Sequence, residues 1–325
     1  MHELDDSTVH YEWNNGIAPR LEIEPGDTVA FRTRDAADGY YSRRSTHADV
    51  IGRGPFRGHP LTGPVRVKGA RPGDVLVVEV LDMRPGADFG WTAIRPGRGL
   101  LPEADFGKPF LQIWDLSDGT HARMDKRVAV PIEAFPGVMG TALDEAGGHS
   151  TMPPRKNGGN MDIKQLTKGS TLYLPVWVDG ALFSVGDGHG AQGDGEVCVT
   201  AVEMGATAVV RFQLHKGLAK RRKFTSPVFS RERYFTDPRF AAPERFLAVM
   251  GMPINAAGEI EAENLTLACR NSVLNMMELL QERGFSRQQA YVICSVAVDL
   301  RVSNVVDVPN YVVSALLPEA IFDGA

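Results

Sequence analysis

The sequence lacks the features that mark disulfide-rich, nucleic-acid-binding and membrane-spanning proteins. It has only three cysteines in 325 residues and no C-x-x-C pair, so neither a disulfide framework nor a thiolate zinc site is indicated. Its 35 lysines and arginines are outnumbered by 40 aspartates and glutamates, whereas nucleic-acid-binding domains are typically basic. No apolar run approaches the length of a membrane span, and the acidic beginning, MHELDDSTVHYEW, lacks the apolar core of a signal peptide. We therefore expect a cytoplasmic protein without nucleic-acid or membrane partners.

Patterns that mark covalent hydrolases are missing as well. The nucleophile motif G-x-S-x-G occurs nowhere in the chain. Cys198 stands between Val197 and Val199 in an apolar segment, which is typical of an inert core cysteine rather than a reactive thiol. Any hydrolytic chemistry is therefore sought among the carboxylates and histidines.

Glycine and proline, by contrast, are abundant. The 34 glycines and 21 prolines exceed the roughly 12% that these two residues contribute to an average chain, which favours a turn-rich β architecture. Residues 25–27 and 72–74 are both Pro-Gly-Asp turns, and each precedes a segment typical of a strand, at 28–33 and 75–80. These two units predict a sheet or sandwich built partly by repetition.

Convincing helical patterns come only late in the sequence. Apolar residues from Leu265 to Leu280 recur at three- and four-residue spacing, and Gly284 follows as a C-cap. Ser286 and Gln289 form a capping-box pattern that opens a second helix. The apolar tail at 305–318 predicts one or two final strands and suggests packing or subunit contact.

These patterns predict a β-rich α+β chain. Its core would be a β-sandwich or jelly-roll-like structure, with an additional α+β layer that contains the two late helices. The expected parts are an N-terminal extension at 1–20, a β-rich part at 21–135, and a C-terminal part at 136–325 that packs intimately against the second.

The densest group of polar side chains lies at 183–203, FSVGDGHGAQGDGEVCVTAVE. Five glycines interrupt it, and a loop that is so costly to order usually wraps an ion or a small ligand. Residues two apart in an extended chain project to the same side, so Asp187 and His189 can converge on one point. The same holds for Asp194 and Glu196. One imidazole with carboxylates is a set of metal ligands.

Four blocks of sequence follow one another in a recognisable order. They are HPLTGPVRVKGARPGD at 59–74, GGNMD at 158–162, GSTLYLPV at 169–176, and GDGHGAQGDGE at 186–196 with Glu203 after a short apolar strand. In this order they resemble the acetamidase/formamidase family of small-amide hydrolases, and the resemblance covers about residues 21–322. The chain departs from the family pattern at Gly190, where Ala is expected, and at Asn157, where many relatives carry His.

The resemblance implies hydrolysis of a small amide. This reaction needs an activated oxygen nucleophile, stabilisation of charge on the carbonyl oxygen, and a proton for the departing ammonia. A divalent cation covers the first two needs, because it lowers the pKa of its water to about 7 and polarises the carbonyl. The expected ligands are Asp187 and His189, joined by Asn160 or Asp162. This set suits Zn²⁺ best, while extra oxygen ligands would allow Ca²⁺ or Mg²⁺.

Three further residues are expected to take part in proton transfer or in its support. Glu196 is the candidate general base and later acid, although it could instead cap amides of its own loop, a role for which Asp194 is the better candidate. His189 is expected to act as a ligand or a catalytic group. Glu145 is a reserve candidate for the acid–base role.

Other polar residues are expected around the substrate. Gln192 could hold the substrate carboxamide by paired hydrogen bonds, and Asn160 and His59 are further candidates for substrate binding. His47 precedes the LTGP region and His149 lies in the loop ahead of GGNMD, and the sequence leaves open whether they enter the site.

The favoured function is a metal-dependent hydrolase of linear C–N bonds in small aliphatic amides of the formamide and acetamide class, giving ammonia and a carboxylate. The alternatives are a hydrolase of a related small amide, such as a urea or a carbamate, and a non-catalytic β module that binds a metal or small ligand. The resemblance also implies a homo-oligomer.

Overall fold

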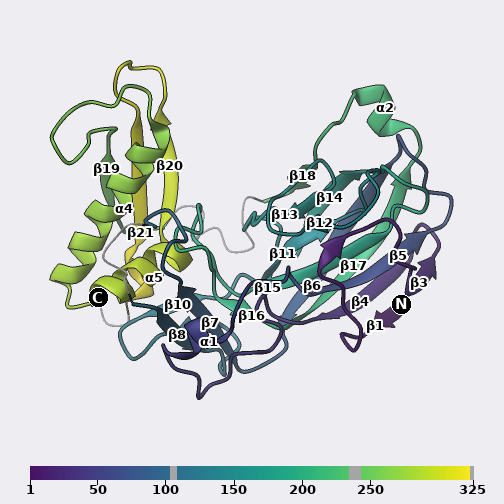
Figure 1. Ribbon diagram of the computed structural model, residues 1–325, viewed down its shortest axis with the longest axis horizontal. Helices are drawn as coiled ribbons and strands as arrows, with labels where there is room; N and C mark the ends of the chain where they lie inside the picture. Colours follow the sequence, from purple (N-terminus) through teal and green to yellow (C-terminus); the bar gives the residue numbers. More distant parts are fainter. Residues whose placement is uncertain (103–107, 234–242, 323–325) are drawn as a thin grey trace.

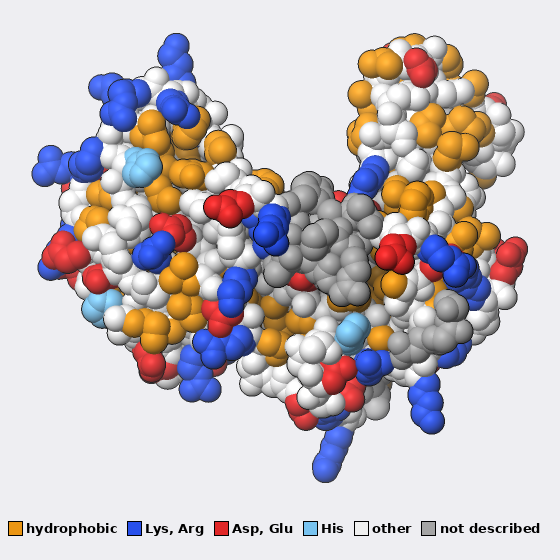
Figure 2. Space-filling view, turned by 180° about the vertical axis from the view of Figure 1, so that it is seen from behind, with side chains coloured by type: hydrophobic (Ala, Val, Ile, Leu, Met, Phe, Trp, Pro, Cys, Tyr) orange, Lys and Arg blue, Asp and Glu red, His pale blue; other side chains and the backbone are white. Residues whose placement is uncertain are grey.

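The computed structural model describes residues 1–102, 108–233 and 243–322. Two large sheets form most of it, and a layer of helices and three strands stands apart near the C-terminus (Figure 1). Seen from behind, two arms rise on either side of a notch (Figure 2). The chain is β-rich with few helices, which confirms the predicted class. The jelly-roll connectivity and the boundaries after residues 20 and 135 stay predictions.

The first large sheet has six strands and contains both units that begin with a Pro-Gly-Asp turn. In spatial order the strands are β1 (His2–Leu4), β4 (Thr28–Thr33), β17 (Ala206–His215), β6 (Val75–Pro85), β14 (Ser170–Pro175) and β18 (Val228–Arg231). The two turn-plus-strand units supply β4 and β6, which flank β17 and pair with it on opposite edges. The repeated design therefore builds one sheet.

The second large sheet has ten strands and carries the glycine-rich segment near its centre. In spatial order they are β10 (Ala129–Pro131), β9 (His121–Arg123), β8 (Phe110–Asp115), β7 (Phe89–Ile94), β16 (Glu203–Met204), β15 (Phe183–His189), β11 (Phe135–Gly140) and β13 (Gly158–Asn160), while β5 (Leu61–Val67) also pairs with β15 and β3 (Leu21–Ile23) with β5. A separate two-stranded sheet joins β2 (Glu12–Trp13) to β12 (His149–Ser150).

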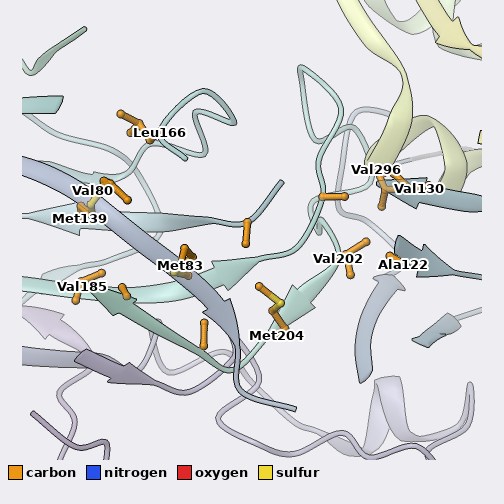
Figure 3. Packing of buried hydrophobic residues seen from close by; sticks show 14 of the residues in the cluster. Val80, Met83, Ala122, Val130, Met139, Leu166, Val185, Val202, Met204 and Val296 are labelled. Carbon is orange, nitrogen blue, oxygen red and sulfur yellow. The ribbon is translucent and has the colours of Figure 1, made fainter. Parts of the chain in front are cut away.

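The two large sheets pack against each other through aromatic side chains. Phe31 of β4 and Phe212 of β17 contact Phe183 of β15, with ring centroids 5.8 and 5.0 Å from that of Phe183. The same hydrophobic cluster continues past Met204 to Val296 of the C-terminal layer (Figure 3). Since large buried aromatic rings dominate core energetics, this continuous core holds β15 firmly in place.

The C-terminal layer joins a three-stranded sheet to two helices. Its elements are β19 (Phe246–Gly251), β21 (Val312–Pro318), β20 (Asp299–Asn304), α4 (Leu265–Glu282), α5 (Arg287–Ala297) and the 3₁₀ turn η1 (Glu319–Ile321). Two short helices, α1 (Asp49–Gly52) and α2 (Leu218–Arg222), lie in other parts of the chain. Both late helices were predicted, and the capping box of Ser286 and Gln289 is present. Helix α4 packs on the sheet, and α5 contacts α4, β7 and β8.

Among the described helices, none combines the length and apolar character needed to cross a membrane. Apolar side chains are nevertheless exposed on the C-terminal layer, including Phe246, Met250, Val302 and Val306 (Figure 2). The homo-oligomer stays a prediction.

The second Pro-Gly-Asp turn is tied to the end of β17 by one buried carboxylate. Asp74 accepts hydrogen bonds from the backbone N–H groups of Arg71 and Gly217, at 2.9 and 2.7 Å, and from Lys216 Nζ at 2.6 Å. Burial opposes ionisation of Asp74, but Lys216 and the two amides outweigh it and lower its pKa. Asp27, in the first turn, is exposed and accepts from the Glu24 amide at 2.9 Å.

We expect Asp74→Ala to lower the free energy of unfolding by about 3 kcal/mol at pH 7, because three hydrogen bonds to a charged group are lost. Asp27→Ala is the matched control and should lower the free energy of unfolding much less, because its ion pair and hydrogen bond are exposed to solvent. Because the pKa of Asp74 is lower in the folded chain, its stabilisation is present above the unfolded pKa and is lost as the pH falls through the folded value. Urea unfolding at pH 7 and in acid checks both statements. Equal destabilisation by the two substitutions would contradict this account of Asp74.

Candidate active site

The centre of the candidate site is built on β15, every residue of which is buried. Asp187 and His189, two residues apart on this strand, lie with their side chains together, as the sequence predicts. His189 is paired in register with Phe135 of β11 on one side and with Glu203 of β16 on the other. The intervening Gly188 is needed because a Cβ there would lie 2.7 Å from the Met204 carbonyl oxygen.

Three acidic side chains of the site sit on strained backbone. Asp162, Asp187 and Glu196 have φ angles of 47°, 59° and 43°, in the left-handed region that non-glycine residues rarely adopt. Each such residue costs on the order of 1–3 kcal/mol and persists only where the surrounding structure imposes it, most often at functional sites. Three of the nine described non-glycine residues with positive φ are therefore ones for which the sequence predicts chemistry.

One imidazole nitrogen faces two carboxylates. His189 Nε2 lies 3.4 Å from Asp187 Oδ2 and 3.4 Å from Glu203 Oε2, and the three residues are only 1–3% exposed. Two ligands bound at about 2.0–2.1 Å to one tetrahedral zinc ion are about 3.3 Å apart. His189 Nε2, Asp187 Oδ1 and Glu203 Oε2 have no hydrogen-bond partner within the described part of the chain. Buried polar atoms left in this way fit a shared cation.

Gln192 determines which nitrogen of His189 carries the proton. Its Nε2 donates to the Asp162 carbonyl oxygen at 2.7 Å, and a carbonyl can only accept. The other end of the carboxamide, Oε1, therefore faces His189 Nδ1 at 2.9 Å and accepts from it. With the proton on Nδ1, the lone pair is left on Nε2, between the two carboxylates. This is the arrangement that outer contacts impose on metal-binding histidines.

Asp162 and Glu196 approach His189 from a second direction. Asp162 Oδ1 lies 4.0 Å from His189 Nδ1, and ligand atoms of Asp162, His189 and Glu196 lie within 4.8 Å of one another. A Cβ on Gly137 of β11 would lie 2.7 Å from Asp162 Oδ1 and 3.0 Å from Asp187 Oδ2. Gly137 therefore leaves open the space on which the three predicted ligands, Asp162, Asp187 and His189, converge.

Burial and the neighbouring charges shift the pKa values of the cluster residues. Burial raises the pKa of Glu203 to about 8 and that of Asp162 to about 7. Burial also opposes the charged form of His189, but the carboxylates of Glu203 and Asp187 outweigh it and raise the pKa of His189 well above its usual value. In Asp187, the effect of burial is outweighed by His189 and His59, and the pKa is lowered. The carboxylates thus favour a cation in their midst.

Glu196 lies beside Asp162 and His189, and its pKa is raised. It is half-buried, and its pKa lies well above the usual value because of burial and then the neighbouring Asp162 carboxyl. It is therefore close to the cluster without belonging to the trio of Asp187, His189 and Glu203.

His59 comes just before β5, and the pairing of β5 with β15 brings it to the site. Its Nε2 lies 3.7 Å from Asp187 Oδ2, and its Nδ1 lies 3.0 Å from Thr151 Oγ1. Burial lowers the pKa of His59, which favours the neutral imidazole. Asn160, at the end of β13, has a buried Oδ1 without a hydrogen-bond partner among the described residues. Neither residue belongs to the clusters around His189.

Several other predicted candidates lie elsewhere. The Glu145 carboxylate is 54% exposed and pairs with Lys156 Nζ at 2.9 Å, and His149 Nε2 contacts the Glu145 carbonyl at 3.3 Å. His47 is exposed, stacks on Phe110 and accepts a hydrogen bond from the Leu111 amide. The structure brings none of these three to the cluster. Cys198 is buried and burial raises the pKa of its thiol to about 11, in agreement with an inert core cysteine.

The loop after β15 is anchored to the C-terminal layer. Gly193 N–H donates to the Ser295 carbonyl at 2.9 Å, and Asp194 N–H donates to Asp299 Oδ1 at 3.1 Å. The Asp194 carboxylate lies 3.7 Å from Lys164 Nζ, which also pairs with Asp299. Asp194 therefore contacts a lysine of the neighbouring loop, whereas a loop-capping role had been expected. Lys164 and Asp194 link the loop of Asp162 to that of Glu196.

Known proteins resemble this chain over most of its length. The sequence profile of the Acetamidase/Formamidase family matches residues 1–146 and 143–324. A formamidase from Methylophilus methylotrophus is 29% identical, covering 98% of this chain and 90% of its own length. An acetamidase from Mycolicibacterium smegmatis is also 29% identical, covering 87% of this chain and 84% of its own.

Two solved structures also superpose on nearly the whole of this chain. A gamma lactamase from Delftia acidovorans superposes with a TM-score of 0.91 at 29% identity, covering 99% of this chain and 94% of its own. An acetamidase from Bacillus halodurans has a TM-score of 0.66 at 28% identity, with 97% and 96% covered. The family profile spans nearly the whole chain, and so do these relatives. The chain therefore belongs to the Acetamidase/Formamidase family and is an amidohydrolase of that type.

Proposed function

We propose that the protein hydrolyses the linear C–N bond of small aliphatic amides with the help of a divalent cation, releasing ammonia and a carboxylate. The observation that carries the proposal is the buried trio of His189, Asp187 and Glu203. His189 Nε2 lies 3.4 Å from an oxygen of each carboxylate, and His189 Nε2, Asp187 Oδ1 and Glu203 Oε2 lack hydrogen-bond partners among the described residues. Relatives that cover nearly the whole chain are formamidases and acetamidases, which supports the substrate class.

The trio would hold the cation, with His59 and Asp162 at its edges. One imidazole and short separations between ligand atoms favour zinc over calcium or magnesium, which prefer more oxygen ligands. Such a cation supplies Lewis acidity, which polarises the amide carbonyl and acidifies water.

The protein's own groups would move the proton and orient the reactants. Glu196 takes a proton from the attacking water as the C–O bond forms, and delivers it to the departing nitrogen as the C–N bond breaks. A carboxyl whose pKa is raised can do both near neutral pH. Gln192 keeps the His189 proton on Nδ1, and thereby keeps Nε2 directed at the carboxylates. Because its carboxamide is occupied on both sides, Gln192 serves His189 in this proposal, although the sequence suggested that it holds the substrate.

The test is ammonia release from formamide and acetamide by the purified protein, before and after chelation and after zinc is restored. Activity that is lost and then regained supports the proposal. Activity that persists after complete removal of metal contradicts the metal-dependent part. Release of ammonia from urea or carbamate alone would favour the related-amide alternative, and metal binding without any turnover would favour the binding module.

Hydrolysis of a five-membered cyclic amide is the second candidate. It is favoured by the agreement of the backbone with a gamma lactamase, at a TM-score of 0.91, against 0.66 for an acetamidase of similar identity. The same bond is broken, but the amine stays attached to the product and no ammonia is released. Chromatographic detection of the amino acid formed from a γ-lactam separates this candidate from the first.

A further inference from the structure

His59 is held in one orientation by Phe56 and Thr151. Its ring packs edge-on against that of Phe56, with the centroids 4.9 Å apart. Its backbone N–H and its Nδ1 both face one oxygen, Thr151 Oγ1, at 2.8 and 3.0 Å. His59 is only 5% exposed, and Thr151 is fully buried. The other ring nitrogen, Nε2, is thereby directed at the candidate site, 3.7 Å from Asp187 Oδ2.

The Thr151 hydroxyl determines which nitrogen of His59 carries the proton. A hydroxyl donates one hydrogen and accepts through two lone pairs. Thr151 Oγ1 accepts from the His59 backbone N–H, and within the described part of the chain His59 Nδ1 is the only acceptor to which it can donate. A proton on Nδ1 would leave the buried hydroxyl hydrogen unpaired, which is costly. Thr151 therefore donates to Nδ1, and the imidazole proton lies on Nε2.

His59 and His189 thus present opposite groups to the site. Gln192 leaves a lone pair on His189 Nε2, whereas Thr151 leaves an N–H on His59 Nε2. A ring nitrogen that carries a hydrogen has no lone pair with which to bind a cation. In agreement, His59 belongs to neither group of ligand atoms that lie within 4.8 Å of one another around His189. His59 therefore brings a hydrogen-bond donor to the edge of the cluster.

This donor is left available. The carboxylate oxygen that it faces, Asp187 Oδ2, is 3.7 Å away, which is beyond the 2.7–3.2 Å of an N–H···O hydrogen bond. In the proposed reaction negative charge develops on the amide oxygen, and an N–H that is already oriented toward such an oxygen stabilises it. A second proton on the ring would keep the N–H at Nε2, so the donor does not depend on the charge of His59.

We propose that His59 is a catalytic residue that donates from Nε2 to the amide oxygen as charge develops there, and that Thr151 is the positioning residue that keeps this N–H in place. The inference rests on the proposed function and specifies a donor for its oxyanion. It narrows the substrate-binding role predicted for His59 to one atom, and it gives a role to Thr151, for which the sequence predicted none.

The first experiment measures zinc content and steady-state kinetics with acetamide. His59→Ala should lower kcat roughly 10²–10³-fold with KM nearly unchanged, and should keep its zinc through dialysis. Thr151→Val should lower kcat at least about tenfold, and Thr151→Ser, which keeps the hydroxyl, should restore most of it. Thr167→Val is the matched control. Thr167 is also buried, but its hydroxyl has no hydrogen-bond partner among the described residues, so kcat should stay within about twofold.

Nitrogen NMR of the zinc-loaded protein, labelled at histidine, tests the tautomer without turnover. The His59 signals, identified by their absence from His59→Ala, should show the proton on Nε2 in the wild type and a mixture of tautomers in Thr151→Val. A proton on Nδ1 in the wild type would overturn the inference. So would loss of zinc from His59→Ala, which would make His59 a ligand, and so would an unchanged kcat. A protein that shows the proton on Nε2 but hydrolyses no amide would overturn the proposed function while supporting the role of Thr151.

Discussion

Replacing Asp187 with asparagine is expected to remove both the bound cation and the activity. The Asp187 carboxylate faces His189 Nε2 at 3.4 Å and His59 Nε2 at 3.7 Å, so it supplies negative charge at the point where the ligand atoms meet. Loss of a group that only supports a ligand already costs 10–100-fold in metal affinity, and loss of the ligand should cost at least roughly 100-fold. The metal content after dialysis, and ammonia release from acetamide, measure the two effects.

Asp194→Asn is the matched control for this prediction. It makes the same chemical change in the same glycine-rich segment, but its carboxylate faces Lys164 at 3.7 Å and lies outside both clusters around His189. It should keep its metal. If Asp187→Asn retained one equivalent of zinc at wild-type affinity, the proposed ligand set would be wrong.

Glu196→Gln is expected to lower kcat by roughly 10²–10⁴-fold while the metal content stays unchanged. The amide has nearly the same shape as the carboxyl group but cannot carry a proton between water and the departing nitrogen. Glu145→Gln tests the reserve candidate for the same role. Because the Glu145 carboxylate is exposed and pairs with Lys156, that substitution should leave kcat within about twofold.

Steady-state kinetics of both variants, together with their zinc content, decide between the two carboxylates. Loss of zinc from Glu196→Gln would assign Glu196 to the ligand set instead. An unchanged kcat would show that another group transfers the proton. A large loss of activity in Glu145→Gln, with Glu196→Gln unaffected, would reverse the assignment.

Local patterns in the sequence predicted local structure well. The turn at 72–74, the helix from Leu265 and the capping box at Ser286 each depend on residues within a few positions of one another. The sheet order could not be predicted in this way. The pairing of β17 with both β4 and β6 joins residues more than a hundred positions apart, and no short pattern encodes it.

Prediction of the site is limited in the same way, because patterns reveal only residues that are close together in the sequence. Asp187 and His189 were found because alternation along a strand places them together. Glu203 belongs to a block used for the resemblance, but no role was given to it, because its pairing with His189 depends on β16, a strand of only two residues. Gly137 could not be found at all, since a glycine between apolar residues has no chemical signature. Gly137 matters because a side chain at this position would fill the space between Asp162 and Asp187.

The anchoring of the glycine-rich loop by the C-terminal layer has a consequence for the order of assembly. Ser295 and Asp299, which hold Gly193 and Asp194, leave the ribosome after the loop that they anchor, Asp299 105 positions after Asp194. Until they emerge, the segment that carries Gln192 and Glu196 lacks its anchor. We therefore expect a nascent chain that ends before α5 to capture zinc poorly, so that the cation is taken up only after α5 and the residues that follow it have emerged.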